Sequence, residues 1–267
     1  MKIKSLPNKK SLSGKIIVPG DKSISHRSII ITSISNGKSV ISNLLESEDV
    51  IKTLKALKKL GVKIEKKNNK YIIYGKGLNS LKKTRKNLYL GNSGTSARLL
   101  IGLLSPQPFD SKIYGDSSLS KRPMNRIIKP LTKMGASFLC KKNKKLPIKI
   151  KGNKNLKPIK YNIPIPSAQI KSGILLASLY IKETSIVTEK INTRDHTEKL
   201  LKIFGSKIIV KKRIKGQKIL IKGKKELKAH NLKIPGDFSS AAFFIVAALI
   251  IKGSKIILRG INLNPTR

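Results

Sequence analysis

The chain has 267 residues and a formal net charge of +45, because 58 lysine and arginine residues face 13 acidic ones. Hydrophobic residues make up 39% of it, so a buried core is expected and wholesale disorder is excluded. The longest apolar run, Ala241–Ile251, is too short for the roughly 20 residues of a membrane span, and the charged N-terminus lacks the apolar segment of a secretory signal. A single cysteine, Cys140, excludes an internal disulfide and is typical of a reducing compartment, so we expect a soluble cytoplasmic protein.

The positive charge alone would suggest a polyanionic partner. Most of the cations are lysines spread along the chain, however, whereas proteins that read nucleic acids rely on arginine for bidentate contacts. Aromatic residues make up only 4% and tryptophan is absent, so bases have few rings to stack on. The composition favours solvated lysines over functional nucleic-acid binding.

Four segments of the chain open alike, with a turn of small or polar residues, a serine and then an apolar stretch of helical length. They begin at Gly20, Gly91, Ile165 and Gly236. A short β-branched strand follows each of them. In the first three segments a second helix then opens, two further strands are expected after it, and that helix ends at Gly61, Gly135 or Gly205.

The pattern predicts an α/β (α+β) fold built from β-α-β-α-β-β units that recur at roughly 70 residues. Such a unit shares its apolar faces with its neighbours, which explains the repetition. Within it, Pro123 suits a first helical position, and Asp195 with Glu198 resembles a capping box. The fourth copy stops at Arg267, so we expect a fragment, a truncated product or one half of a split protein.

The openings of the first helices are candidate anion sites, because helix N-termini present unpaired N–H groups and the positive end of the dipole. Lys22 and Arg27 follow the first opening, Gly94 and Arg98 lie at the second, and Ser167–Gln169 forms the third. Two arginines at second-helix openings, Arg122 and Arg194, suit a carboxylate or phosphate. The pattern predicts a small ligand that carries both groups.

No metal or nucleotide cofactor is predicted. His196 lies near Asp195 and Glu198, but no second cluster completes a ligand set. Cys140 follows an apolar pair without a nearby histidine, which favours a packed thiol over a nucleophile. The sequence contains no Walker A or GxGxxG motif.

Together these openings resemble the 3-phosphoshikimate 1-carboxyvinyltransferase (EPSP synthase) family, in its N-terminal part. The resemblance covers the whole chain. It rests on PGDKSISHR at Pro19–Arg27, GNSGTSARLL at Gly91–Leu100, GDSSLSKRPM at Gly115–Met124, SAQIKSGILLA at Ser167–Ala177, TRDHTEKLL at Thr193–Leu201 and PGDFSSAAF at Pro235–Phe243.

The resemblance implies transfer of the enolpyruvyl group of phosphoenolpyruvate to the 5-hydroxyl of shikimate 3-phosphate, a step of aromatic amino acid biosynthesis that needs no cofactor. It implies that Lys22 is catalytic and contacts both substrates. The residues implied for shikimate 3-phosphate are Lys22, Ser23, Arg27, Ser167, Gln169 and Arg194, and those implied for phosphoenolpyruvate are Lys22, Gly94, Arg122 and Gln169. Where many members have a second serine, this chain has Ala168.

The family fold has two similar domains of three units each, with the active site between them. The resemblance implies a first domain at 20–230, with 1–19 and 231–267 belonging to an incomplete second domain. The remainder of that domain normally supplies the proton-accepting aspartate, so we expect little turnover from this chain alone. Family members are mostly monomeric, and Gly94 implies sensitivity to glyphosate, which occupies the phosphoenolpyruvate site.

Three alternatives stay open. The sister enzyme that acts on UDP-N-acetylglucosamine shares the fold, but it typically has asparagine at the position of Ser23 and a cysteine on a mobile loop. A catalytically inactive polyanion-binding protein of the same fold would suit the charge. A half-enzyme completed by a separate partner chain would suit the unfinished fourth unit.

Overall fold

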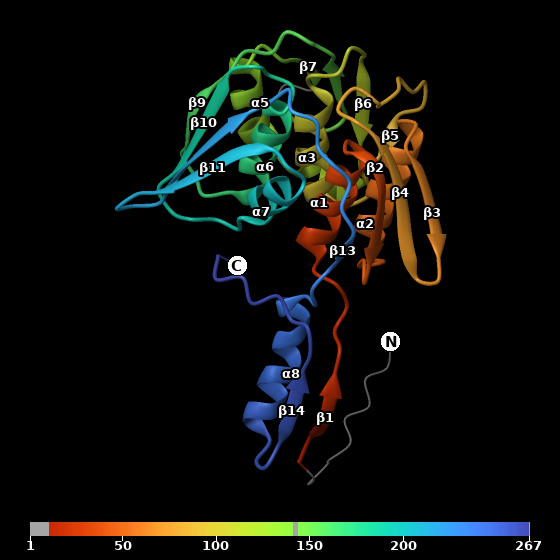
Figure 1. Cartoon of the computed structure of the whole chain (residues 1–267), viewed down its shortest axis with the longest axis vertical. Coiled ribbons are helices and arrows are strands. Elements are labelled where there is room, and N and C mark those ends of the chain that lie inside the picture. Colours follow the sequence, from red (N-terminus) through yellow and green to blue (C-terminus); the bar gives the residue numbers. More distant parts are fainter. Residues whose placement is uncertain (1–10, 141–143, 267) are drawn as a thin grey trace.

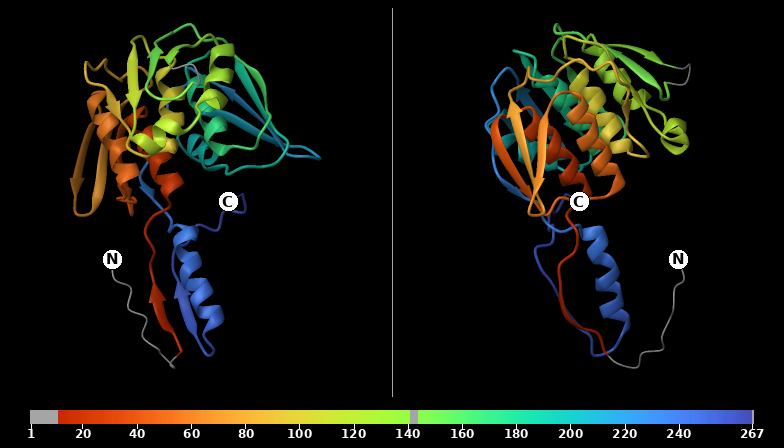
Figure 2. Two further views of the ribbon diagram at one scale, coloured as in Figure 1. Left: turned by 180° about the vertical axis from the view of Figure 1, so that it is seen from behind. Right: turned by 90° about the vertical axis from the view of Figure 1, so that its right-hand side faces the viewer.

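The computed structural model describes residues 11–140 and 144–266. The first ten residues, three residues of the lysine-rich loop after Cys140 and the final Arg267 lie outside the described residues. Figure 1 shows a wide main body, made of the elements from α1 to β13, and a narrow small lobe, made of β1, α8 and β14. Figure 2 shows the same separation from two further sides.

The first unit of the main body builds a four-stranded sheet in the order β13-β2-β4-β3. Strands β3 and β4 form the expected hairpin, and its turn residues Asn68 and Asn69 both have a positive φ, as type I′ hairpins require. The bounds of this unit are α1 Lys22–Ser33, β2 Asn36–Ser42, α2 Glu48–Lys59, β3 Lys63–Lys67, β4 Lys70–Lys76 and β13 Leu232–Lys233.

The second and third units repeat this topology, and each takes all four strands from its own segment of the chain. Their sheets run β5-β6-β8-β7 and β9-β10-β12-β11, each with a parallel first pair and antiparallel partners after it. The second unit consists of β5 Leu88–Tyr89, α3 Gly94–Leu104, β6 Ser111–Tyr114, α4 Ser117–Lys121, α5 Asn125–Lys133, β7 Ser137–Cys140 and β8 Ile148–Lys151. The third consists of β9 Lys160–Ile163, α6 Ala168–Ser178, β10 Thr184–Glu189, α7 His196–Ile203, β11 Lys207–Lys212 and β12 Gln217–Lys222. The predicted β-α-β-α-β-β unit is confirmed.

Two details differ from the sequence expectations. The strand that completes the first sheet is β13, which arrives from beyond the third unit, because its parallel partner β2 has an edge free for it. The second unit breaks its second helix into α4 and α5, so Pro123 lies between two helices and is not a first helical residue. Arg122 is extended there, because a residue before proline is pushed out of the helical region.

The first helices of the three units, α1, α3 and α6, form the centre of the main body (Figure 1). Nearly every residue after their first turn is buried, and in α1 this includes polar side chains such as His26 and Arg27. The second helices α2, α5 and α7 are amphipathic, with lysines on their exposed faces. The sheets therefore enclose three central helices, and the polar residues at the starts of these helices must find partners inside the protein.

The helices α3 and α6 cross with their backbones in contact. A Cβ added at Gly102 would lie 2.1 Å from the carbonyl oxygen of Gly173, and one added at Gly173 would lie 2.9 Å from that of Arg98. Real Cβ atoms do not approach backbone so closely, so only glycine fits at this crossing.

The small lobe joins the main body through two chain crossings that lie side by side. The amide of Asp21 donates to the carbonyl of Pro235 at 2.8 Å, and that of Asp237 donates to the carbonyl of Pro19 at 2.8 Å. Beyond this neck, β1 (Ser13–Ile16) pairs in parallel with β14 (Lys255–Leu258), and α8 (Phe238–Ile250) packs beside β14.

The helix α8 leaves most of its apolar surface open to solvent in the described chain. Ala241 is its only buried residue, whereas Phe243 and Leu249 are 78% and 79% exposed. Within the described residues, no helix has both the length and the apolar character needed to cross a membrane.

We predict that Gly102→Ala destabilises the protein, although alanine is normally about 1 kcal/mol better than glycine inside a helix. The added methyl group overlaps the backbone of α6, and overpacking of this kind costs about 1–3 kcal/mol or more. Urea unfolding of both proteins measures the difference. A stabilised variant would show that the two helices do not meet in this way.

Candidate functional site

The starts of the three central helices are each closed by a side-chain cap. Asp21 accepts from the amide of Ile24 at 3.0 Å, and Ser93 accepts from that of Ser96 at 3.2 Å. The predicted site residue Ser167 does the same for Ile170 at 3.4 Å. These caps leave other N–H groups of each first turn for a ligand.

Side-chain contacts bring these helix starts together with that of α7. Gln169 at the start of α6 donates to Thr95 Oγ1 at the start of α3, at 2.9 Å. Arg27 in α1 donates from one terminal nitrogen to Ser172 Oγ in α6 at 2.9 Å and from Nε to Thr197 Oγ1 in α7 at 2.7 Å. Side-chain hydrogen bonds therefore link the N-terminal halves of α1, α3, α6 and α7 to one another.

The first cluster of predicted residues lies between α1 and α7. Arg194 donates to Ser23 Oγ at 3.3 Å, and Arg27 donates to the carbonyl of Ser23 at 2.9 Å. The ammonium of Lys22, half exposed, forms an ion pair with Asp49 of α2 at 2.7 Å. Arg194 and Lys22 are both exposed, so both are open to an incoming anion.

Arg27 differs from its neighbours because it is only 2% exposed. Burial lowers the pKa of Arg27 to about 10, against which Glu198 acts to raise it. The guanidinium therefore keeps its charge at neutral pH. Three of the five N–H groups of Arg27 donate to other groups of the protein. Arg27 therefore fixes the junction of α1, α6 and α7 and also places a positive charge there.

The second cluster lies where α3, α6 and the α4–α5 junction meet. Arg98 donates to Gln169 Oε1 at 2.9 Å and to the carbonyl of Gly94 at 3.0 Å, and Arg122 donates to Asn92 Oδ1. A Cβ added at Gly94 would lie 2.8 Å from Arg98 and 3.2 Å from Arg122, so the two guanidinium groups converge over this glycine.

These arginines lack acidic partners. Every ion pair between described residues has a lysine as its cation. Burial, and then the charges of Arg122 and Arg126, lower the pKa of Arg98. An anion bound here would relieve the repulsion between these like charges. This is the strongest electrostatic sign of a ligand site in the described chain.

Some contacts were not foreseen from the sequence. Thr95, Ser172 and Thr197 lie inside the motifs that were singled out, but no role was assigned to them, and Arg98 was named only for its place at the second opening. Asp49 carried no sequence signal. The proposed capping box is wrong: Asp195 makes no cap bond, and its carboxylate accepts from Asn264 and Thr266 instead.

The residues around His196 do not form a metal centre. No group of three or more histidine, cysteine, aspartate or glutamate side chains in the described residues is placed to hold a metal ion. Burial lowers the pKa of His196 to about 4, so its ring is neutral at neutral pH. Cys140 is half-buried at the end of β7 and packs against the core.

A buried polar chain connects the site to α2. His26 Nδ1 lies 2.9 Å from Thr53 Oγ1, which lies 2.5 Å from Ser96 Oγ in α3. Burial lowers the pKa of His26 to about 3, with the charges of Arg27 and Lys22 acting in the same direction and that of Asp49 against it. The ring is therefore neutral in the folded protein.

The fold and these two clusters define a class, an α/β protein of repeated units in which arginines gather at the starts of the helices. The sequence profile of the family described as EPSP synthase (3-phosphoshikimate 1-carboxyvinyltransferase) matches residues 6–267, and the chain belongs to this family.

Relatives and solved structures agree with the profile. A 3-phosphoshikimate 1-carboxyvinyltransferase of Vesicomyosocius okutanii is 52% identical over 96% of this chain and 58% of its own length. One from Streptococcus pyogenes serotype M1 is 46% identical over 100% of this chain and 61% of its own. An EPSP synthase structure from Acinetobacter baumannii matches with a TM-score of 0.91 and 48% identity, over 98% of this chain and 58% of that one. The chain thus spans about three fifths of the length of these relatives.

We predict that His26 makes the folded protein sensitive to acid. Its folded pKa of about 3 lies below the usual 6.5, so between these values the unfolded state binds more protons. The free energy of unfolding should therefore fall below about pH 6.5, by up to about 1.4 kcal/mol per pH unit from this group.

Urea unfolding from about pH 7.5 to about pH 4.5 tests this with His26→Asn, whose amide keeps a polar group near Thr53 but does not titrate. The variant should lose stability less steeply with acid than the parent. Equal slopes would contradict the prediction.

Proposed function

We propose that this chain contributes the shikimate 3-phosphate site and part of the phosphoenolpyruvate site of an enzyme that transfers the enolpyruvyl group. The observation that carries the proposal is the pair of arginines that converges over Gly94 without an acidic partner, in a chain that belongs to this family. The first cluster, with Ser23 and Arg194 in contact, supports a second anion site close by.

In the proposed reaction a proton adds to the methylene carbon of phosphoenolpyruvate. The 5-hydroxyl oxygen of shikimate 3-phosphate bonds to the adjacent carbon and gives up its proton, which yields a tetrahedral intermediate. The bond from that carbon to the phosphate oxygen then breaks, phosphate leaves, and loss of a proton from the methyl group restores the double bond. Positive charges that hold both anions in this geometry lower the barrier by orientation and electrostatics.

Each predicted residue has a role in this proposal. Arg122, Gly94 and Gln169 would bind phosphoenolpyruvate, with Arg98, which holds the Gln169 amide together with Thr95, as an additional cation. Ser23, Arg27, Ser167, Gln169 and Arg194 would bind shikimate 3-phosphate. Lys22 would contact both substrates. Its ammonium lies on Asp49 of α2, one helical turn before Thr53, and Thr53 contacts Ser96 near the start of α3.

The domain division is part of the proposal. The three units support a first domain near 20–230, to which β13 adds its strand, and the pairing of β1 with β14 supports a second domain that includes 1–19 and the chain after β13. The exposed apolar residues of α8 are consistent with a helix that other parts of such a domain cover. We also propose a cytoplasmic, monomeric protein, as the sequence and the family suggest.

We predict that the folded protein binds shikimate 3-phosphate and that Lys22→Ala weakens this binding by about 10- to 100-fold, the range for a lost charged hydrogen bond. Calorimetric titration measures both affinities. Lys66→Ala is the matched control, since Lys66 also forms an ion pair, with Glu46, but lies outside the site.

UDP-N-acetylglucosamine should not bind, and salt-dependent DNA binding in place of shikimate 3-phosphate binding would favour the polyanion-binding alternative. A folded protein that ignores shikimate 3-phosphate would overturn the proposal.

We predict that Gly94→Ala weakens the binding of glyphosate to the protein saturated with shikimate 3-phosphate by about tenfold or more. The new methyl group would push both guanidinium groups away from the ligand position. The affinity for shikimate 3-phosphate should stay within about twofold, because its residues are on other turns. Unchanged glyphosate affinity in the variant, again by calorimetry, would show that the arginines do not grip a ligand over Gly94.

A further inference from the structure

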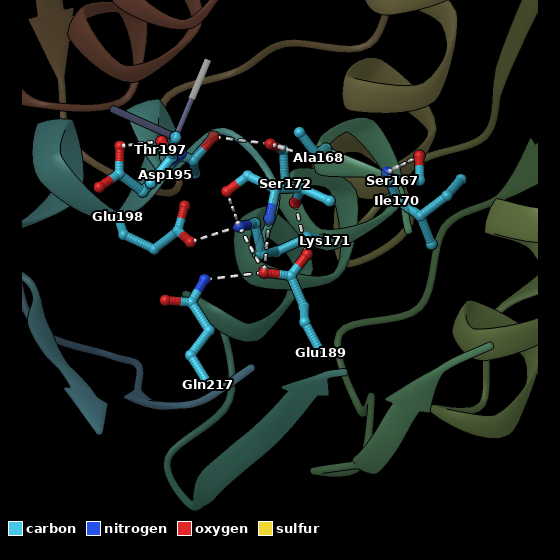
Figure 3. Close-up of polar contacts among 12 residues, drawn as sticks. Ser167, Ala168, Ile170, Lys171, Ser172, Glu189, Asp195, Thr197, Glu198 and Gln217 are labelled. Carbon is cyan, nitrogen blue, oxygen red and sulfur yellow. Dashed lines mark hydrogen bonds and ion pairs between the residues drawn. The ribbon is translucent and has the colours of Figure 1, made fainter. Parts of the chain in front are cut away.

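A buried lysine lies beneath the first cluster and has no role in the proposed reaction. Lys171 in α6 is 0% exposed, and its ammonium forms ion pairs with Glu189 at 2.8 Å and Glu198 at 2.7 Å. It also donates to the carbonyl of Thr193 at 3.1 Å. Figure 3 shows the carboxylates of Glu189, from β10, and Glu198, from α7, turned toward this ammonium.

The loop that carries Arg194 is held by this group. Thr193, the residue before Arg194, gives its carbonyl to Lys171, and its hydroxyl donates to the Glu189 carboxylate. Glu189 in turn is fixed by Lys171 and by Gln217, which donates to it at 2.7 Å. The backbone of the Arg194 loop is therefore tied to α6 at the position just before the arginine.

The same ammonium is connected to Arg27. Arg27 donates to the hydroxyl of Thr197, which is the chain neighbour of Glu198. Arg27 also donates to the hydroxyl of Ser172, which is the chain neighbour of Lys171. Burial, and then the charge of Glu189, raise the pKa of Glu198, while Lys171 acts to lower it. Lys171 thus helps to keep Glu198 charged beside the buried Arg27.

Stability does not explain why these charges are buried. Replacement of a buried ion pair by apolar residues of similar volume is often neutral or stabilising, because desolvation of the charges offsets their attraction. An ion cluster with three acceptors makes contacts that depend on geometry. These contacts fix the positions of three chain segments relative to one another.

We propose that Lys171 is a positioning residue for the recognition of shikimate 3-phosphate, and that it fixes Arg194 and Arg27 together with the start of α6. This inference depends on the proposed function for the identity of the ligand. Lys171 does not itself meet the ligand, because it is fully enclosed.

The first test is calorimetric titration of the folded chain with shikimate 3-phosphate. Lys171→Met should lower the affinity by at least about tenfold. In case this variant fails to fold, Thr193→Val removes only the hydroxyl that donates to Glu189 and should also lower the affinity, by several fold. Thr188→Val, on the same strand as Glu189 and half-buried, is the matched control and should bind as the parent does.

The variant Ile221→Ala serves to distinguish a positioning role of Lys171 from a merely structural one. This change empties part of the core in β12 and lowers Tm without touching the cluster. If Lys171 has a positioning role, Lys171→Met or Thr193→Val must lose more affinity for shikimate 3-phosphate than Ile221→Ala does. The comparison holds when the Tm of Ile221→Ala is the same or lower. Parent-like affinity in a folded Lys171→Met or Thr193→Val variant would overturn the inference.

Hydrogen exchange gives an answer that does not need the ligand. The amides of residues 190–195 should exchange faster in Lys171→Met and Thr193→Val than in the parent, while those of α3 stay protected. If the folded parent ignores shikimate 3-phosphate, the proposed function fails, and the exchange data still decide whether Lys171 holds the Arg194 loop. Unchanged exchange in this loop would overturn the positioning role.

Discussion

The contact between the backbones of α3 and α6 at Gly102 and Gly173 is the constraint on which the site depends. Because the two helices touch there, their N-terminal turns lie close enough for Gln169 to bond both Thr95 and Arg98. The carbonyl of Arg98 itself lies against Gly173. The packing of the core and the geometry of the candidate binding site therefore depend on the same helix contact. A side chain at this crossing would displace both clusters.

Lysine and arginine have separate tasks in this molecule. Lysines supply the cations of every ion pair between described residues, whereas Arg27, Arg98, Arg122 and Arg194 gather at the helix starts and bond mainly neutral groups of the protein. Arginine suits this place because its planar fork stays charged when buried and matches carboxylate and phosphate geometry. The net charge of the chain therefore says little about the candidate site, because it is dominated by scattered lysines, whereas the candidate site consists of four arginines and Lys22 at the helix starts.

The sequence was informative where the signal is local. Capped apolar stretches predicted α1, α3 and α6, and the two strands expected after Gly61 are β3 and β4. It failed where partners lie far apart in the chain. Nothing near Leu232 shows that β13 completes the first sheet, Glu198 pairs with Lys171 and not with the helix start, and Lys171 looks like any other lysine of a lysine-rich chain. Such partners are chosen by tertiary packing, which a linear pattern does not record.

The neck between the two parts of the molecule limits how they can move. A single connecting strand would allow the small lobe to spin about the strand axis. Here two adjacent crossings exchange hydrogen bonds at Pro19 and Pro235, and Asn262 adds a contact to Asp21. The chain after β14 adds a third link, because Asn264 and Thr266 donate to the carboxylate of Asp195 at the start of α7. Rotation of the small lobe about the neck would break these bonds as well, so three separate segments constrain how it faces the starts of α1 and α7.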